Sequence, residues 1–204
     1  MVSIDEIASI PKEEIPAVSE TLTPEEIHLL VGLLDEKDDK IRYPALLLLR
    51  SRSEKHNDVY PYMDVFIQKL GNPNSFMRSI GVMLIADNVR WDKQDKFSGI
   101  FNHYLDIVND EKPITVRQCI QNLGQIVAAR PEFAGRICEK LLDIDISQRK
   151  ETQQKLVLLD ILSVFIITRR IETNEKVERY ILNALTGELL DKKSKAEIQQ
   201  RMAV

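Results

Sequence analysis

The sequence predicts an all-α fold built from stacked helix pairs, an α-solenoid. Only seven glycines and eight prolines occur in 204 residues, which leaves few turns and favours long helices over many short strands. A hydrophobic residue followed by arginine recurs at Ile41-Arg42, Met77-Arg78 and Val116-Arg117. These arginines are 36 and 39 residues apart, and Lys155 follows after another 38. A near-constant spacing of this size is typical of helical repeats.

The composition is that of a globular protein without a disulfide framework. Hydrophobic residues make up 44% and charged residues 29% of the chain, which is long enough to bury a core. Its two cysteines, Cys119 and Cys138, are too few for a disulfide framework or a metal cluster, and we expect reduced, buried thiols in a cytosol.

The sequence gives little sign of a signal peptide or of a membrane-spanning segment. The first residues are acidic where a signal peptide needs a basic segment. The longest apolar run, residues 156–167, is interrupted by Asp160 and Ser163 and is too short to span a bilayer. We therefore expect a cytoplasmic protein that does not bind a membrane.

The net charge of −4 is unevenly distributed along the chain. Residues 1–39 hold eleven acids and two bases, a net charge of −9, so residues 40–204 carry +5. We expect residues 1–22 to form an acidic, partly helical extension that Pro11 and Pro16 interrupt, residues 23–170 to form the repeats, and residues 171–204 to form C-terminal capping helices.

The helices are predicted from their start signals and apolar periodicity. Thr23-Pro24-Glu25-Glu26 reads as a capping box, with Thr23 as N-cap and Glu26 reaching back. Asn74 or Ser75 and Asp92 are further expected caps. In residues 113–129 an apolar stripe recurs at Val116, Ile120, Leu123 and Val127. The helices are expected at about 23–34, 40–52, 57–70, 74–90, 92–108, 113–129, 131–142, 147–168 and 174–200, the last with a break at Gly187. Strand signals are absent.

The repeating unit resembles a HEAT repeat, the two-helix module of armadillo-type solenoids. The resemblance rests on a turn acid or amide, a hydrophobic-Arg pair that opens the second helix, and a small or apolar residue three positions later. It covers about residues 23–168, although Ile120 is large where a small residue is usual. It implies a right-handed α-α superhelix of about four helix pairs with capping helices at both ends. The residues that carry it are Ile41-Arg42 with Ala45, Met77-Arg78 with Gly81, and Val116-Arg117 with Ile120.

Three longer segments resemble small bacterial HEAT-repeat proteins without settled function. Some of those proteins carry a label taken from the SufBD iron–sulfur assembly scaffold. A SufBD core is a β-helix, and a cluster would need several thiolates, so the label does not suit a helical chain with two cysteines. We expect no cofactor. The segments are IRYPALLLL, ADNVRWD and DEKPITVRQCI.

In HEAT proteins the second-helix arginines typically bond to acids or carbonyl groups of the preceding turns and form a ladder within the stack. Asp35 precedes Arg42 by seven residues and Asp110 precedes Arg117 by seven. The resemblance therefore implies a structural ladder of Asp35, Arg42, Arg78, Asp110 and Arg117, although Gly71 stands at the corresponding position before Arg78.

The charge of the second helices suggests a binding surface. The four expected second helices, counted with their flanking residues as 40–55, 74–90, 113–130 and 147–170, together hold fourteen bases and four acids. Second helices line the concave face in the folds that this chain resembles. A basic groove would attract an anionic partner. We expect a non-catalytic scaffold that binds a protein or an acidic peptide, with a nucleic acid less favoured. The expected binding residues are Arg50, Arg52, Arg90, Trp91, Arg130 and Lys155.

Two alternatives remain open. HEAT-like DNA glycosylases of the alkylation-repair type place Trp and Asp side chains on a basic concave face, and Arg90-Trp91-Asp92 with Asp87 offers those residue types. The acidic N-terminal segment, with Glu13, Glu14, Glu20, Glu25 and Glu26, could instead dock in a basic groove of its own chain or of a neighbour.

Motifs of ordinary catalysis are missing from the sequence. His28, His56 and His103 lack metal-ligand spacing, and no glycine-rich phosphate loop, GxSxG or CxxC occurs. We expect neither an enzyme nor a metal protein.

Overall fold

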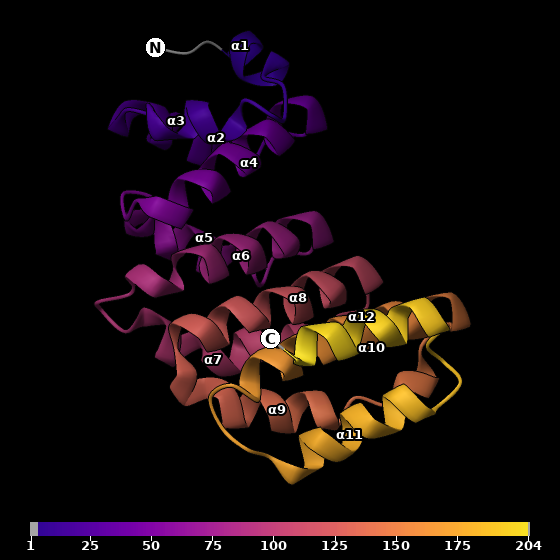
Figure 1. Cartoon of the computed structure of the whole chain (residues 1–204). Coiled ribbons are helices and arrows are strands. Elements are labelled where there is room, and N and C mark those ends of the chain that lie inside the picture. Colours follow the sequence, from indigo (N-terminus) through magenta and orange to yellow (C-terminus); the bar gives the residue numbers. More distant parts are fainter. Residues whose placement is uncertain (1–3, 204) are drawn as a thin grey trace. The chain divides into compact units, whose positions relative to one another are not determined.

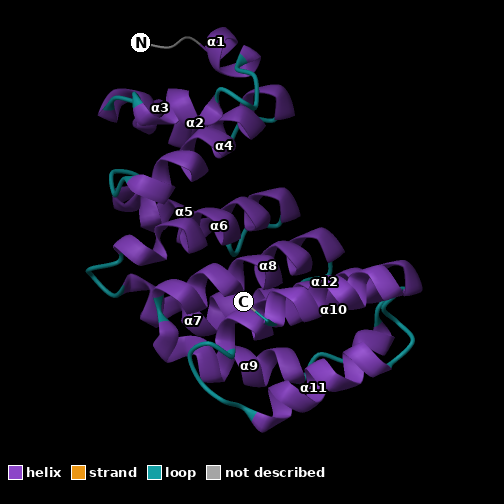
Figure 2. Ribbon diagram, viewed as in Figure 1, coloured by secondary structure: helices purple, strands orange, loops and turns teal. Residues whose placement is uncertain are grey.

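A computed structural model describes residues 4–203, and within them the chain consists of helices joined by loops, with no strand (Figure 2). The all-α prediction is confirmed. The chain divides into two compact units, Met1–Phe101 and Asn102–Val204. Among the helices of residues 4–203, none has both the length and the apolar character that crossing a bilayer requires.

The first unit contains three pairs of helices and the start of a seventh helix. The short helices α1 and α2 both pack on α4, which also contacts α3 and α6, while α5 packs on α6. Helix α4 is therefore the central helix of this unit (Figure 1). The bounds are α1 Ile4–Ser9, α2 Ile15–Glu20, α3 Pro24–Leu33, α4 Asp39–Lys55, α5 Met63–Lys69, α6 Ser75–Asn88 and α7 Lys96–Asp106, with short 3-10 turns at Tyr60–Tyr62 and Val89–Trp91.

The second unit is organised around α8 and α10. These two helices pack along each other, and α10 also contacts α9, α11 and α12. The bounds are α8 Pro113–Ala129, α9 Ala134–Leu142, α10 Glu151–Thr168, α11 Glu175–Thr186 and α12 Lys192–Met202, with 3-10 turns at Ile107–Asn109, Pro131–Phe133 and Ile146–Gln148.

Local sequence signals account for where several helices begin and end. The capping box is present: Thr23 accepts a hydrogen bond from the Glu26 amide, and the Glu26 carboxylate accepts one from the Thr23 amide. Asn74 caps α6, and Asp92 accepts the amides of Lys96 and Phe97 at the start of α7. Gly187 ends α11.

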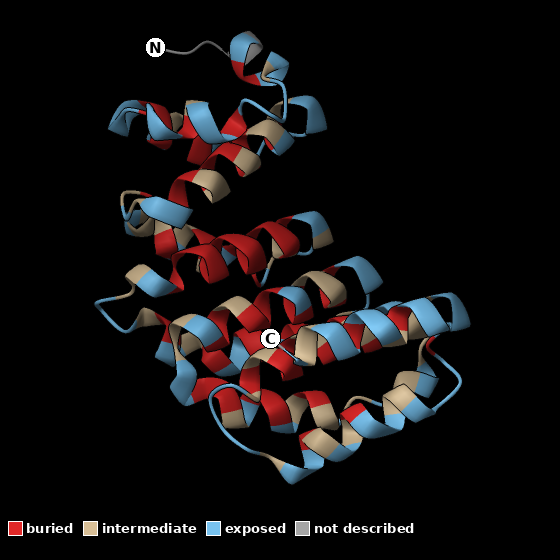
Figure 3. Cartoon of the chain, in the orientation of Figure 1, coloured by how far each residue is buried: buried red, intermediate tan, exposed pale blue. Residues whose placement is uncertain are grey.

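The apolar stripes face the core as their periodicity predicts. All four stripe residues of α8 are at most 1% exposed, and α6 is buried along nearly its whole length (Figure 3). Cys119 and Cys138 are both buried thiols. Burial raises the pKa of each thiol, because the thiolate is poorly solvated there.

Polar contacts join helices that are about one repeat apart in the sequence. On the first helices, Lys69 pairs with Asp35 and Lys96 with Asp64, at separations of 34 and 32 residues. In the second unit Arg136 and Lys140 bond to Asn102 and Asp106, in both cases 34 residues earlier. Neighbouring pairs are thus held in one register by charged and polar side chains.

Candidate binding site

A buried ion pair joins the second helices α4 and α6. Arg50 Nε lies 2.7 Å from Asp87 Oδ2, and Arg50 Nη2 lies 3.3 Å from Oδ1, which makes the contact bidentate. The Arg50 side chain is 33% exposed, whereas that of Asp87 is 5% exposed. Arg50 is therefore not an unpaired base, as its place among the expected binding residues had assumed, although a third of its side chain is exposed.

The Arg50–Asp87 pair lies in a pocket of about 430 Å³, here called the α4 pocket. One part of its wall is apolar, from Ile15, Pro16 and Leu47. Lys12 Nζ lies 5.4 Å from the centroid of the Tyr43 ring, within the range of a cation–π contact. The lining residues are Lys12, Ile15, Pro16, Glu20, Tyr43, Leu47, Arg50, Ser51, Glu54, Lys55 and Asp87.

The charges that line the α4 pocket are balanced. Three bases, Lys12, Arg50 and Lys55, face three carboxylates, Glu20, Glu54 and Asp87. The second helices are rich in bases, but acids from α2 and α6 reach the same space. This part of the second-helix surface therefore lacks the surplus of positive charge that counting along the helices predicts.

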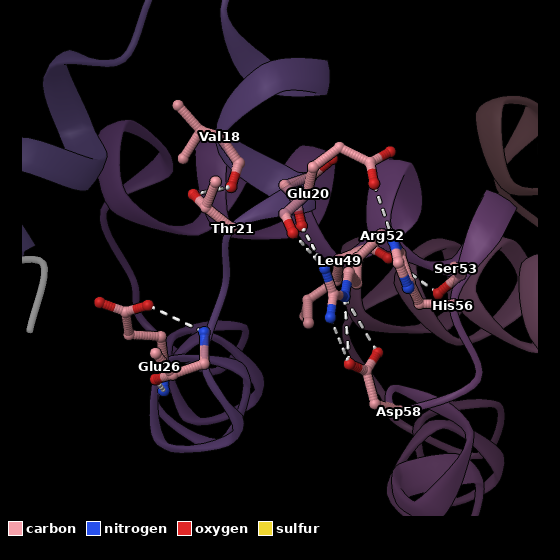
Figure 4. A network of polar contacts seen from close by, with 11 residues as sticks. Val18, Glu20, Thr21, Glu26, Leu49, Arg52, Ser53, His56 and Asp58 are labelled. Atoms are coloured by element: carbon pink, nitrogen blue, oxygen red, sulfur yellow. Dashed lines mark hydrogen bonds and ion pairs between the residues drawn. The ribbon is translucent and has the colours of Figure 1, made fainter.

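Arg52 is used to hold the N-terminal segment onto α4. Its side chain is 10% exposed, its Nη1 donates to the carbonyl oxygens of Ser19 and Glu20 at 3.0 and 2.8 Å, and its Nη2 lies 2.7 Å from Asp58 Oδ2 (Figure 4). The Arg52 guanidinium is thus used in contacts within the chain. Its contact with a partner stays a prediction.

Glu20 completes the contact between α2 and α4. Its carboxylate lies 2.7 Å from Lys55 Nζ and 2.8 Å from His56 Nε2. The hydrogen bond from Lys55, and then that from His56, lowers the pKa of Glu20 to about 2. The acidic N-terminal segment thus rests on basic residues of its own chain.

Arg90, Trp91 and Asp92 have separate structural contacts. Arg90 is exposed and donates from Nη1 to the Glu54 carbonyl at 3.1 Å. The Trp91 indole donates to the Ser53 carbonyl at 2.8 Å. Asp92 accepts the Tyr60 hydroxyl at 2.6 Å and caps α7. Burial and the bond to Asp92 raise the pKa of Tyr60 to about 12. Trp91 and Asp92 do not line the pocket that contains Asp87. The Trp and Asp side chains that the glycosylase alternative requires are therefore not brought together in that pocket.

Arg42 and Arg78 bond to carbonyl groups of the preceding turns. Arg42 donates to the Glu36 carbonyl at 3.1 Å and pairs with Asp39. Arg78 donates to the Asn72 carbonyl at 2.8 Å. Both contacts belong to the kind that the ladder implies.

Two of the expected ladder acids have other partners. Arg117 bonds to Asp160 at 2.6 and 3.2 Å, and Asp110 accepts the Lys112 amide. Asp35 pairs with Lys69. The seven-residue spacing considers only the local turn, whereas the partners of Arg117 and Asp35 lie 43 and 34 residues further along the chain.

The remaining expected binding residues are also ion-paired. Arg130 pairs with Glu132 and lies 5.1 Å from the Phe133 ring centroid. Lys155 pairs with Asp191, the N-cap of α12, and this bond lowers the pKa of Asp191. Neither residue therefore presents an uncompensated charge.

Two features of the site were missed by reasoning from the sequence. Asp87 follows Arg50 by 37 residues, close to one repeat period, and this spacing could have identified the pair. Lys12 gave no such signal, because its contact depends on how α2 folds back onto α4. Among residues 4–203, no three His, Cys, Asp or Glu side chains are grouped as metal ligands would be.

Comparison with known proteins gives a structural match alone. No family model matches the chain, and no curated protein matches it. Its structure is similar to the crystal structure of an engineered protein from the Northeast Structural Genomics Consortium. The TM-score is 0.56 at 16% identity, and the match covers 98% of this chain and 85% of that one. At this identity the similarity shows a shared helical fold and carries no function.

Proposed function

We propose that the chain is a HEAT-type helical-repeat module that binds a segment of another protein without catalysis. The repeat assignment is supported by contacts between equivalent helices at separations of 32 to 38 residues, such as Lys96 with Asp64 and Asn88 with Ser53. These separations agree with the spacing of the Arg42, Arg78 and Arg117 motifs. A stack in which each pair contacts its neighbours would produce such a pattern.

The solenoid architecture can be tested by small-angle X-ray scattering of the whole chain. A compact domain of this length has a radius of gyration of about 17 Å. A right-handed superhelix of about four helix pairs is elongated, and its radius should clearly exceed that value. A measured radius at or below the compact value would reject the solenoid.

The observation that carries the binding proposal is the α4 pocket, with an apolar wall beside charged groups. Leu47 and the Tyr43 ring offer apolar surface, and Tyr43 is 47% exposed. An apolar side chain of the partner would bury against this wall, which supplies affinity through the area removed from water.

The charged groups suggest that the partner segment also carries an acid. Lys12 lies over an aromatic face and has no carboxylate partner among the described residues, and the Arg50 side chain is 33% exposed. A partner carboxylate next to the apolar anchor would meet these two cations. Because the lining also contains three acids, a uniformly acidic peptide would be repelled, and we propose a segment with one acid beside an apolar residue. The unpaired thiols are consistent with a cytoplasmic location.

The test compares two double variants of the full chain in affinity capture followed by mass spectrometry. Tyr43→Ala with Lys12→Glu alters the pocket through exposed residues. Leu182→Ala with Arg179→Glu makes the same kinds of change at exposed positions of α11. A protein that the wild type and the α11 variant retain, and that the pocket variant loses, supports the proposal. Equal retention by both variants would reject the α4 pocket as the docking site.

A further inference from the structure

Three arginines gather where the ends of α10 and α12 meet in the second unit. Arg169 and Arg170 follow the last residue of α10, and Arg201 lies in the last turn of α12. Together with Ile166, Met202 and Ala203 they line a pocket of about 300 Å³. Arg170, Arg201 and Ile166 also line a neighbouring hollow of about 530 Å³.

Two of the three guanidinium groups have side-chain partners, and the three charges are only partly neutralised. Arg169 pairs through Nε with Glu178, and Arg201 Nη1 donates to Ser163 Oγ at 2.9 Å. Arg170 is exposed and has no side-chain partner among residues 4–203. Several N–H donors of the three groups therefore remain available to a ligand.

Among the described residues, the positive charge of the three arginines exceeds the negative charge beside them. Glu178 offsets one of the three arginines. The carbonyl ends of α10 and α12 each contribute roughly half a negative charge, which explains why arginines are favourable here but leaves a net positive site. Among residues 4–203, no carboxylate side chain lines the smaller pocket, whereas Glu197 lines the neighbouring hollow. An anion is therefore best accommodated in the smaller pocket.

We propose that this pocket, the arginine pocket, binds the phosphate group of a small phosphate monoester. Guanidinium groups match phosphate oxygens in geometry, and several of them can bond to one dianion at once. The volume lies at the lower end of the range for small-molecule sites. The Ile166 side chain and Met202 supply an apolar wall that could contact the organic part of the ligand.

The first test is calorimetric titration of the full chain with inorganic phosphate at constant ionic strength. Arg170→Ala should weaken binding by on the order of tenfold, because one charge-assisted contact is lost. Arg179→Ala removes an exposed charge from α11 outside the pocket and should change the affinity less than twofold. Both residues are exposed, so neither substitution should impair folding. Equal weakening by both variants would reduce the site to general charge attraction and overturn the proposal.

The pH dependence separates a phosphate site from a carboxylate site. The second pKa of a phosphate monoester is about 6, so its affinity should rise between pH 5.5 and pH 7.5 as the dianion forms. Sulfate and acetate keep their charge over this range, and their binding should not change. Phenyl phosphate should bind more tightly than inorganic phosphate if the apolar wall takes part. Absence of saturable phosphate binding at pH 7.5, or acetate binding as strong as phosphate, would overturn the proposal.

Discussion

The carboxylate of Glu20 links the N-terminal segment to α4, and its protonation state therefore affects the stability of this contact. It bonds to both Lys55 and His56 at the end of α4. Its pKa in the folded chain is about 2, against 4.5 for an unperturbed glutamate. The ionised form is therefore favoured by folding.

We expect the free energy of unfolding to depend less on pH in the acid range in Glu20→Gln than in the wild type. A carboxylate whose pKa is lowered on folding stabilises the fold above its unfolded pKa, and this contribution disappears as the pH falls from about 4.5 towards 2. The wild type should exceed the variant in free energy of unfolding at pH 7, and the difference should shrink by pH 3. Urea denaturation at both pH values measures this. A difference that is the same at pH 7 and pH 3 would contradict the assignment.

Residue-level prediction from the sequence succeeded where partners are local and failed where they are not. Both partners of the Thr23–Glu26 capping box lie within four consecutive positions, so the local sequence is enough to predict it. Asp160 bonds to Arg117 from 43 residues away, and only the register between α8 and α10 brings the two together. Asp110 was the expected partner because it precedes Arg117 by seven residues, as Asp35 precedes Arg42.

At the scale of elements, the contact between α5 and α6 depends on a glycine. A Cβ at Gly81 of α6 would lie 2.7 Å from the Phe66 carbonyl oxygen and 3.1 Å from Lys69 Cβ. The first of these atoms belongs to the backbone of α5 and cannot rotate away. Gly81 therefore sets how closely the two helices approach.

Gly81→Ala should destabilise the chain, whereas Gly32→Ala should stabilise it. Alanine gains up to about 1 kcal/mol in helix propensity at either site. At Gly81 the clash costs about 1–3 kcal/mol, which outweighs this gain, and we expect a net loss of up to about 2 kcal/mol. At Gly32 in α3 nothing lies within 4 Å of an added Cβ, so the gain should remain. Denaturant unfolding of both variants gives the two signs, and a stabilised Gly81→Ala would contradict the close approach.

Element bounds were predictable to the extent that caps and breakers mark them. Asn74, Asp92 and Gly187 all act where the sequence places them. Helix α10 begins later than expected, at Glu151, because a separate 3-10 turn at Ile146–Gln148 precedes it. Asp145 accepts the Ser147 amide and caps that turn. This cap therefore begins a single 3-10 turn and not the long helix.

For the whole molecule, the sequence predicted the helical class well and the surface charge poorly. Periodic apolar residues and repeated hydrophobic-Arg pairs are enough for an all-α fold. The charge of a surface depends on which acids fold against which bases, and four of the five expected binding cations are in ion pairs with carboxylates from other segments or neighbouring turns. These cations are Arg50, Arg52, Arg130 and Lys155.

Removing the N-terminal helices should destabilise the first unit and leave the second unit intact. A chain that begins at Leu22 loses α1 and α2, including Ile7 and Ile15, which are 2% and 6% exposed. It also loses the two backbone carbonyl groups that accept hydrogen bonds from Arg52. Two buried isoleucines account for about 4 kcal/mol. Because each unit has its own dense internal contacts, the loss should be confined to residues 22–101.

Hydrogen exchange followed by mass spectrometry distinguishes the two units directly. Amides of α4 should exchange much faster in the shortened chain than in the full chain, whereas amides of α8 and α10 should keep their protection. Lys12→Glu in the full chain is the matched control, since it changes the charge of the segment but leaves Ile7 and Ile15 in place. Faster exchange throughout α4, α8 and α10 would mean that the chain unfolds as one cooperative unit, and the two-unit description would then be wrong.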